Sequence, residues 1–189
     1  MRCFVAIELP HAIQQQLAGL QKALTAAAGS GVKWSRADHI HLTLKFLGEV
    51  PDGDISAVCE TVRQVAARYR PFDLEAAGAG CFPQRGAARV LWVGLKDVPA
   101  TLIACQEELE LALAELGFAV EDRPFHPHLT LGRVKDYRAG HEMRRSIEPY
   151  ARFDAGSFQA DALTVFESVL QRAGPVYTPL ARCELSGGA

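Results

Sequence analysis

The sequence predicts an α+β fold of two pseudo-symmetric lobes, each a mainly antiparallel sheet with helices on its outer face, and a cleft between them. The main reason is an internal repeat, in which residues 2–50 and 89–137 each contain an apolar strand, an amphipathic helix and a histidine motif in the same order. A second reason is that turn residues separate the remaining strand-like segments into hairpins. We expect residues 1–189 to form one two-lobed domain.

The two repeats correspond segment by segment. Each begins with a short apolar strand, at 2–9 and at 89–96. An amphipathic helix follows, at 10–29 and at 98–117, because apolar residues recur there at steps of three and four. These residues are Ile13, Leu17, Leu20 and Leu24 in the first helix, and Leu102, Cys105, Leu109, Ala112 and Leu116 in the second. Each helix therefore has one face to bury.

The other expected elements complete the two lobes. A helix is expected at 55–69, with Asp52 or Asp54 as its N-cap, and a shorter one near 141–150. Two hairpins are also expected. The first pairs 72–81 with 89–95 around a turn at 83–86, and the second pairs 158–170 with 176–185 around Ala173-Gly174-Pro175.

Composition excludes several classes of protein. The 189 residues are 49% hydrophobic and 22% charged, which suits a folded globular protein, and the net charge of −2 argues against coating nucleic acid by bulk electrostatics. The five cysteines are scattered and never spaced as CxxC, which favours a reducing, cytoplasmic environment. No apolar segment reaches the about 18 to 20 residues that cross a bilayer. We expect no membrane span and no cofactor.

The sequence His-Leu-Thr-Leu occurs twice, at His41–Leu44 and at His128–Leu131. In a strand, alternate side chains point to opposite faces, so the histidine and threonine share one face while the leucines enter the core. One such motif could be an ordinary polar strand. Recurrence of the polar pair at matching places in both repeats instead favours a shared site.

Two histidines and two threonines can perform phosphoryl transfer without a metal. One imidazole removes a proton from the attacking oxygen and the other delivers one to the leaving oxygen, and a pKa of about 6.5 suits both tasks near neutral pH. Hydroxyl groups of Thr43 and Thr130 can donate hydrogen bonds to the non-bridging oxygens. The interpretation is a metal-independent phosphoesterase.

His39 and His126 also correspond, which leaves a metal site of four imidazoles as an alternative. Catalytic metal sites commonly combine histidine with a carboxylate, and neither motif strand contains Asp or Glu. We therefore expect no metal and interpret His39 and His126 as neighbours of the site. The cluster Arg144-Arg145 is interpreted as a solvated helix face.

The segments WSRADHIHLTLKFLGEV at 34–50 and RPFHPHLTLGRV at 123–134 resemble the paired signatures of the two-histidine phosphoesterase superfamily. They are most similar to its RNA 2',3'-cyclic phosphodiesterases, also called 2'-5' RNA ligases. The opening MRCFVAIELP and the closing FESVLQRAGPVYTPL share the resemblance, which therefore spans nearly the whole chain. It implies hydrolysis of RNA 2',3'-cyclic phosphate ends to 2'-phosphates, with reversible 2'-5' ligation in some members.

The resemblance also implies roles for individual residues. His41 would be the proton donor to the departing 3' oxygen and His128 the acceptor that activates water. Arg133 matches a basic residue that often follows the second motif and could bind phosphate as a fork, although strict alternation points it away from His128. Lys45 lies on the catalytic face by alternation and is a further phosphate-binding candidate.

The implied partner is RNA with a 2',3'-cyclic phosphate end, such as a tRNA fragment, or a related nucleotide, and the implied state is a monomer. An aromatic ring should stack on the adjoining base, for which Phe46, Phe82, Phe125 and Tyr177 are available. Two alternatives stay open: a phosphodiesterase of a small cyclic phosphate or nucleotide metabolite, and a non-catalytic module that binds RNA ends.

Overall fold

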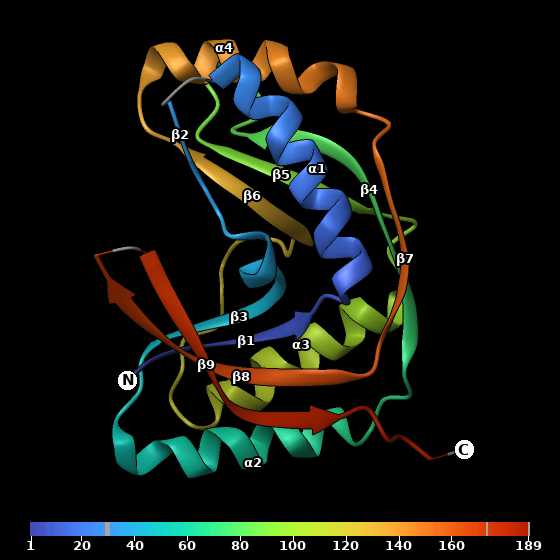
Figure 1. The fold of residues 1–189 in the computed structure, drawn as a ribbon. Helices are drawn as coiled ribbons and strands as arrows, with labels where there is room; N and C mark the ends of the chain where they lie inside the picture. Colours follow the sequence, from blue (N-terminus) through green and yellow to red (C-terminus); the bar gives the residue numbers. More distant parts are fainter. Residues whose placement is uncertain (29–30, 173, 189) are drawn as a thin grey trace.

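The computed structural model describes residues 1–28, 31–172 and 174–188. Within these residues nine strands form one antiparallel sheet, eight of them in the order β7-β4-β5-β6-β3-β1-β8-β9, while β2 pairs with β6 (Figure 1). The strands are β1 (Arg2–Glu8), β2 (Val32–Trp34), β3 (His41–Glu49), β4 (Phe72–Phe82), β5 (Val90–Lys96), β6 (His128–Val134), β7 (Asp154–Ala160), β8 (Ala162–Gln171) and β9 (Gly174–Glu184).

The strand order divides the sheet into two lobes that meet between β3 and β6. The first lobe contains β3, β1, β8 and β9, and the second contains β6, β5, β4 and β7, with β2 beside β6. The only register pair between β3 and β6 is Leu42 with Leu129. The expected fold, an antiparallel α+β structure of two lobes, is therefore confirmed.

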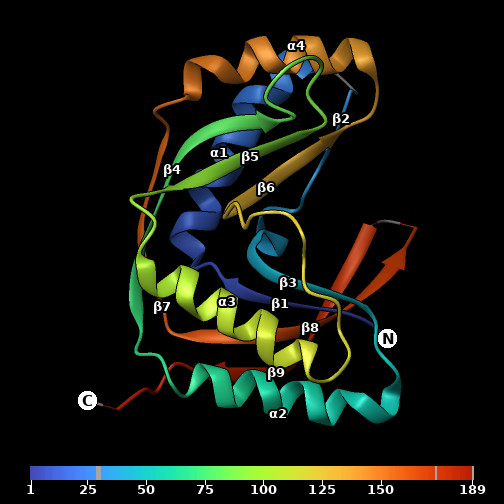
Figure 2. The ribbon, with the colours of Figure 1, turned by 180° about the vertical axis from the view of Figure 1, so that it is seen from behind.

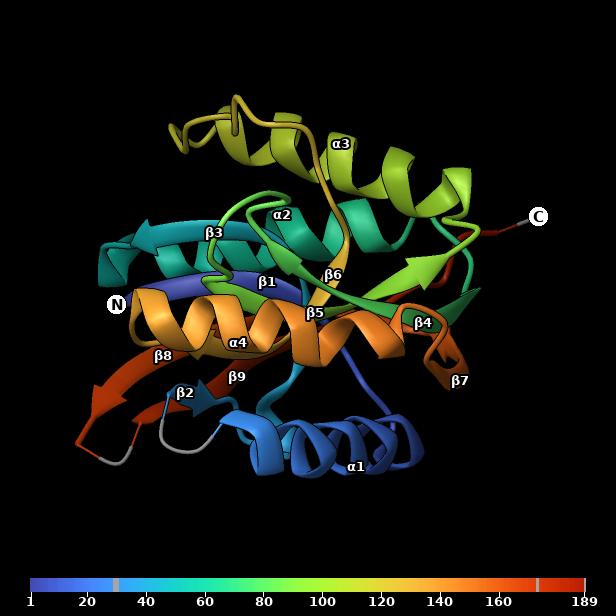
Figure 3. The same ribbon diagram turned by 90° about the horizontal axis from the view of Figure 1, so that it is seen from above.

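Four α-helices of the described chain cover the lobes in two pairs. They are α1 (His11–Ala28), α2 (Ile55–Ala66), α3 (Ala100–Ala114) and α4 (Tyr137–Ile147). Helices α2 and α3 pack together on the first lobe, while α1 and α4 pack together on the second (Figure 2). Seen from above, the two pairs lie on opposite sides of the molecule (Figure 3).

Helices α1 and α3 each cover the lobe that does not contain the strand before them. Strand β1 ends opposite His41, beside the Leu42–Leu129 pair that joins the lobes. The chain therefore leaves β1 at the junction, and α1 continues over the second lobe. Strand β5 likewise ends near the junction, because Gly94 pairs with His128, and α3 packs on the first lobe. Each lobe is thus covered by one helix from each half of the chain.

The helices lie where the sequence predicts them, with earlier ends. The helix expected at 55–69 ends at Ala66, and Asp54 precedes it without a side-chain capping bond. The last helix begins earlier than expected because Asp136 caps it, its carboxylate accepting a hydrogen bond from the Ala139 amide at 2.9 Å. A short 3₁₀ turn at Glu148–Tyr150 continues it.

The hairpin of β4 and β5 is confirmed, whereas the prediction of one strand over 158–170 is wrong. That segment contains two strands with Asp161 between them: β7 pairs with β4 in the second lobe and β8 pairs with β1 in the first. The chain changes partner at Asp161, whose exposed carboxylate pairs with Arg182 at 2.8 Å. Of the expected turn at 173–175, Ala173 lies outside the described residues, and Gly174 already pairs with Gln171.

Both histidine strands contain a β-bulge at the same position. Val5 pairs with Lys45 and Ala6 with Thr43, so Leu44 is an extra residue in β3. In β6, Leu91 pairs with Gly132 and Trp92 with Thr130, so Leu131 is extra in the same way. A bulge reverses the alternation of side chains beyond it, so the residues after each motif point to the opposite face from that expected.

The main core lies between the sheet and the helices, and both strand faces near the junction contribute to it. Leu42 and Leu129 are fully buried there, as are Leu17 of α1 and Leu109 of α3. Among the described residues, no helix is long and apolar enough to cross a membrane.

We predict opposite effects for two glycine-to-alanine changes. A Cβ on Gly140 of α4 would lie 2.6 Å from the Ala88 carbonyl oxygen, so Gly140→Ala should lower the free energy of unfolding by about 1 to 3 kcal/mol. Gly19 of α1 has no neighbouring atom within 4 Å of such a Cβ, so Gly19→Ala should raise it by about 0.5 to 1 kcal/mol. Urea unfolding measures both, and equal shifts would contradict close packing at Gly140.

Candidate active site

The two histidine motifs meet at the junction of the lobes. Because Leu42 pairs with Leu129, His41 and His128 lie on either side of that pair, on the sheet face opposite the helices. In an antiparallel pair such diagonal neighbours are separated by about 7 to 8 Å. This spacing leaves room for a small group, such as a phosphate, between the two rings.

Both histidine rings are oriented by the same backbone contact. Nδ1 of His41 lies 2.8 Å from the carbonyl oxygen of His39, and Nδ1 of His128 lies 2.7 Å from that of His126. A carbonyl oxygen only accepts, so each Nδ1 must carry the proton and each Nε2 is left for the site. His39 and His126 thus contribute backbone carbonyls to the orientation of the two rings.

His41 lies on an aromatic cluster of the first lobe. Its ring stacks on Phe4 with centroids 4.6 Å apart and meets Tyr177 edge-on at 5.3 Å, and Phe4 in turn stacks on Phe166 at 5.2 Å. Burial among these rings lowers the pKa of His41 from 6.5 to about 4, because the charged imidazolium loses its solvation. His41 is therefore neutral at pH 7 in the free protein.

His128 has an aromatic neighbour of its own in the second lobe. Phe82 of β4 meets the His128 ring edge-on at 5.2 Å, and Trp92 of β5 lies 5.2 Å beyond Phe82. Gly80 gives the indole its place, because a Cβ there would lie 2.6 Å from two Trp92 ring atoms. Each catalytic candidate thus has an aromatic ring against it.

Thr43, Thr130 and Arg133 lie on the same face as the histidines. Both threonines are half-buried, and within the described residues neither hydroxyl has a hydrogen-bond partner. The bulge at Leu131 turns Arg133 to this face, although strict alternation points it away. Burial raises the pKa of Tyr177, and the positive charges of Arg133 and Arg2 oppose that increase, so the Arg133 guanidinium lies close to the first lobe.

A cavity of about 210 Å³ lies beside His41. Its polar lining includes Glu8, Asp38, Gln14 and Tyr177. Glu8 accepts a hydrogen bond from the Thr164 hydroxyl at 2.9 Å, and Asp38 pairs with Arg36 at 2.6 Å. This end of the site therefore carries carboxylates.

Comparison with known proteins identifies the family. A family model described as LigT like Phosphoesterase matches the chain twice, over residues 7–92 and 93–177. The chain is 32% identical over 180 residues to an RNA 2',3'-cyclic phosphodiesterase of Methanothermobacter thermautotrophicus, covering 95% of this chain and 96% of that protein. It is 32% identical over 188 residues to the enzyme of the same name from Thermotoga maritima, covering 100% and 97%.

A solved structure agrees. Escherichia coli LigT in complex with 3'-AMP matches with a TM-score of 0.79 at 32% identity, over 98% of each chain. The chain belongs to the LigT-like phosphoesterase family. The resemblance to two-histidine phosphoesterases found in the sequence is therefore confirmed, as is the enzyme class that it implies.

In this LigT-like phosphoesterase, Lys45 does not lie on the catalytic face, and the expectation that it binds phosphate is wrong. The bulge at Leu44 turns it into the core, where it is 5% exposed. Its ammonium group pairs with the Glu110 carboxylate of α3 and donates to the Ala119 carbonyl oxygen at 2.5 Å. Lys45 therefore ties the catalytic strand to α3 and to the segment leading into β6.

Two buried glutamines of the LigT-like fold support the bulges and were missed from the sequence. Gln21 of α1 donates to the Leu131 carbonyl oxygen at 2.8 Å, and Gln106 of α3 donates to the Leu44 carbonyl oxygen at 3.4 Å. Both lie at helix positions flanked by core leucines. A glutamine on the apolar face of a predicted helix is the signal that could have found them, because a buried amide needs a partner.

The four aromatic candidates of this LigT-like phosphoesterase have different surroundings. Tyr177 and Phe82 contact His41 and His128 respectively. Phe46 lies 6.2 Å from Phe4 and is 69% exposed, whereas Phe125 packs against the main core. Phe46, Phe82 and Tyr177 are thus placed to contact a ligand. Within the described chain, no group of three or more His, Cys, Asp or Glu residues is arranged to hold a metal ion.

We predict that Lys45 contributes to stability. Lys45→Met leaves the Glu110 carboxylate buried without its cation and should lower the free energy of unfolding by about 3 to 5 kcal/mol. The matched control is Lys96→Met, which breaks the more exposed Lys96–Glu75 pair and should cost less than about 1 kcal/mol. Denaturant unfolding of both variants tests this, and equal losses would count against it.

We predict that His41 makes stability depend on pH. Its pKa is about 4 in the folded protein and about 6.5 when unfolded, so the unfolded state binds more protons between these values. The contribution of neutral His41 is therefore lost as pH falls from about 6.5 towards 4. Unfolding measured at pH 7, 5.5 and 4.5 should show a smaller loss in His41→Gln than in the wild type, with exposed His11→Gln as the control. Identical pH dependence in wild type and His41→Gln contradicts the buried imidazole.

Proposed function

We propose that this protein hydrolyses RNA ends carrying a 2',3'-cyclic phosphate to 2'-phosphates, by metal-independent acid and base catalysis from His41 and His128. The observation that carries the proposal is the matched presentation of both rings, each with Nδ1 held by a carbonyl and Nε2 directed to one shared face. The choice of substrate is supported by two relatives, each named RNA 2',3'-cyclic phosphodiesterase and 32% identical over nearly the whole chain.

In the proposed reaction a cyclic phosphate lies between the two imidazoles. His128 Nε2 accepts a proton from water, whose oxygen attacks phosphorus. The bond from phosphorus to the 3' oxygen breaks on the opposite side, and His41 Nε2 supplies the proton that this oxygen needs. The phosphate remains on the 2' oxygen.

The donor role requires His41 to gain a proton. Burial keeps its ring neutral in the free protein, with a pKa of about 4. A bound cyclic phosphate carries a negative charge, which raises the pKa of an adjacent imidazole. We infer that His41 becomes protonated together with substrate binding, and that the aromatic cluster beneath it makes this proton available for transfer.

Thr43, Thr130 and Arg133 are the proposed phosphate-binding groups. Both hydroxyls can donate to the non-bridging oxygens, and the Arg133 guanidinium can bind them as a fork. These groups stabilise the charge that develops on the phosphate, which is the task a metal performs in other phosphodiesterases.

The same arrangement supports the reverse reaction. If an RNA 5' hydroxyl replaces water, protons move between the same two rings in the opposite direction, and a 2'-5' linkage forms. We further propose a monomer acting in a reducing compartment such as the cytoplasm, because all five cysteines are free and buried.

A small nucleotide is the second candidate substrate. The cavity beside His41 has about 210 Å³ and is lined by hydrogen-bonding groups suited to one base or ribose. E. coli LigT has also been crystallised with 3'-AMP, a single nucleotide. Comparing a mononucleoside 2',3'-cyclic phosphate with an oligonucleotide that has the same end separates the two candidates. Tight binding without product would instead indicate an RNA-end-binding module.

We predict that EDTA-treated wild-type protein converts a short RNA 2',3'-cyclic phosphate to the 2'-phosphate. His41→Ala and His128→Ala should each lower kcat by at least about 10²-fold, since each removes one proton transfer. Chromatography that resolves 2'- from 3'-phosphate products measures this, with His11→Ala as the control.

Each other outcome points elsewhere. A 3'-phosphate product reverses the assignment of the leaving oxygen. Activity that appears only after metal is added, or that survives in both histidine variants, rules out catalysis by the paired imidazoles.

A further inference from the structure

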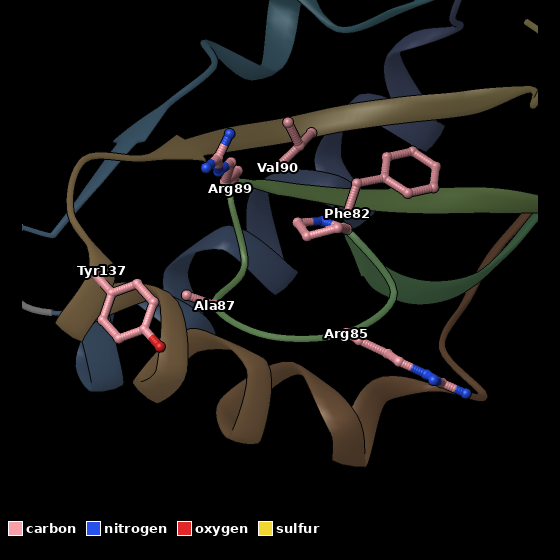
Figure 4. A pocket seen from close by; sticks show the side chains of 7 residues that line it. Phe82, Arg85, Ala87, Arg89, Val90 and Tyr137 are labelled. Atoms are coloured by element: carbon pink, nitrogen blue, oxygen red, sulfur yellow. The ribbon is translucent and has the colours of Figure 1, made fainter.

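A second hollow, of about 480 Å³, lies on the other lobe beside His128. Figure 4 shows it between the loop that joins β4 to β5 and the start of α4. Its lining residues are Phe82, Pro83, Arg85, Ala87, Arg89, Val90 and Tyr137. Its size falls in the range of about 300 to 1,000 Å³ that is usual for ligand pockets.

The hollow is continuous with the catalytic face. Phe82 lines it and also contacts the His128 ring at 5.2 Å. Val90 pairs with Phe82 across β4 and β5, and with Arg133 across β5 and β6. A chain bound at His128 can therefore extend into this hollow without crossing a strand.

The wall of the hollow is held in shape by α4. Arg144 donates hydrogen bonds to the carbonyl oxygens of Gly86 at 2.5 Å, Gln84 at 2.9 Å and Pro83. Gly140 lets α4 lie directly against Ala88, whose amide donates to the Gly140 carbonyl oxygen at 3.1 Å. The interpretation of Arg144 as part of a solvated helix face is therefore wrong, because it builds the loop that carries Arg85.

Charge distinguishes this hollow from the cavity beside His41. Arg85 and Arg89 line it, no carboxylate does, and nearby Asp136 is engaged as the cap of α4. The cavity beside His41 instead contains Glu8 and Asp38. A polyanion is attracted to the first and repelled from the second.

We propose that this hollow binds the nucleotides that precede the terminal cyclic phosphate of an RNA strand. Arg85 and Arg89 bind backbone phosphates as forks, and the Tyr137 ring, which is 75% exposed, stacks on a base. The terminal nucleoside then lies towards the carboxylate-lined cavity at His41. This inference rests on the proposed function, because it assigns the direction of the same substrate through the site.

The test compares two substrates that share one reactive end. The first is adenosine 2',3'-cyclic phosphate, and the second is a tetranucleotide that ends in the same group. In the wild type, kcat/KM should be higher for the tetranucleotide. Arg85→Ala/Arg89→Ala should lower tetranucleotide kcat/KM about tenfold at low salt, mainly through KM, and leave the mononucleotide within about twofold.

Salt dependence and base stacking give independent measurements. The slope of log(kcat/KM) against log salt should fall by about 0.7 for each arginine removed, since each releases one phosphate contact. Tyr137→Ala should reduce the preference for the tetranucleotide, while Tyr137→Phe should retain it. The matched control is Arg70→Ala, an exposed arginine after α2 that lies outside both hollows.

The outcomes separate this inference from the proposed function. No preference for the longer substrate in the wild type, equal losses on both substrates, or the same loss in Arg70→Ala would each overturn it. If the wild type turns over neither substrate, the proposed function fails. Fluorescence anisotropy with a labelled tetranucleotide 2'-phosphate then still tests the hollow, and unchanged affinity in the double arginine variant would overturn the inference.

Discussion

The arrangement of the site depends on one register pair, Leu42 with Leu129. It is where two otherwise separate half-sheets become one sheet, and both side chains are fully buried in the common core. A shift of one residue in either strand would exchange its faces, moving a leucine to solvent and a histidine into the core. The hydrophobic pattern of the motif therefore does more than build a strand. It sets the register that places His41 and His128 on the same side.

The exchange of helices follows from the same junction and makes each motif depend on the other half of the chain. Gln21, from the first half, bonds to the bulge carbonyl of Leu131 in the second, and Gln106, from the second half, bonds to that of Leu44 in the first. A bulge leaves a backbone carbonyl outside the regular ladder, and a buried carbonyl needs a donor. The glutamines supply it, so neither histidine strand is complete without the helix of the other half.

The lobes, most helices and the two motifs could be predicted because they rest on local periodicity and on repetition along the chain. What could not be predicted is non-local. The bulges depend on the pairing of β3 with β1 and of β6 with β5, so alternation placed Lys45 wrongly and left Arg133 pointing away. The segment 158–170 is apolar throughout, and only the partner strands show that it is divided between lobes at Asp161.

The departures from symmetry carry the direction of the substrate. The bulges place Phe46 on the catalytic face in the first lobe and Arg133 at the matching position in the second, so one half offers a ring where the other offers a positive charge. Beyond them, carboxylates line the cavity of the first lobe and arginines the hollow of the second. A cyclic phosphate has a nucleoside on one side and a chain of phosphates on the other. A frame with equal halves could accept it in either direction, whereas unequal charge favours the one that keeps the phosphates beside Arg89 and presents the departing 3' oxygen to His41.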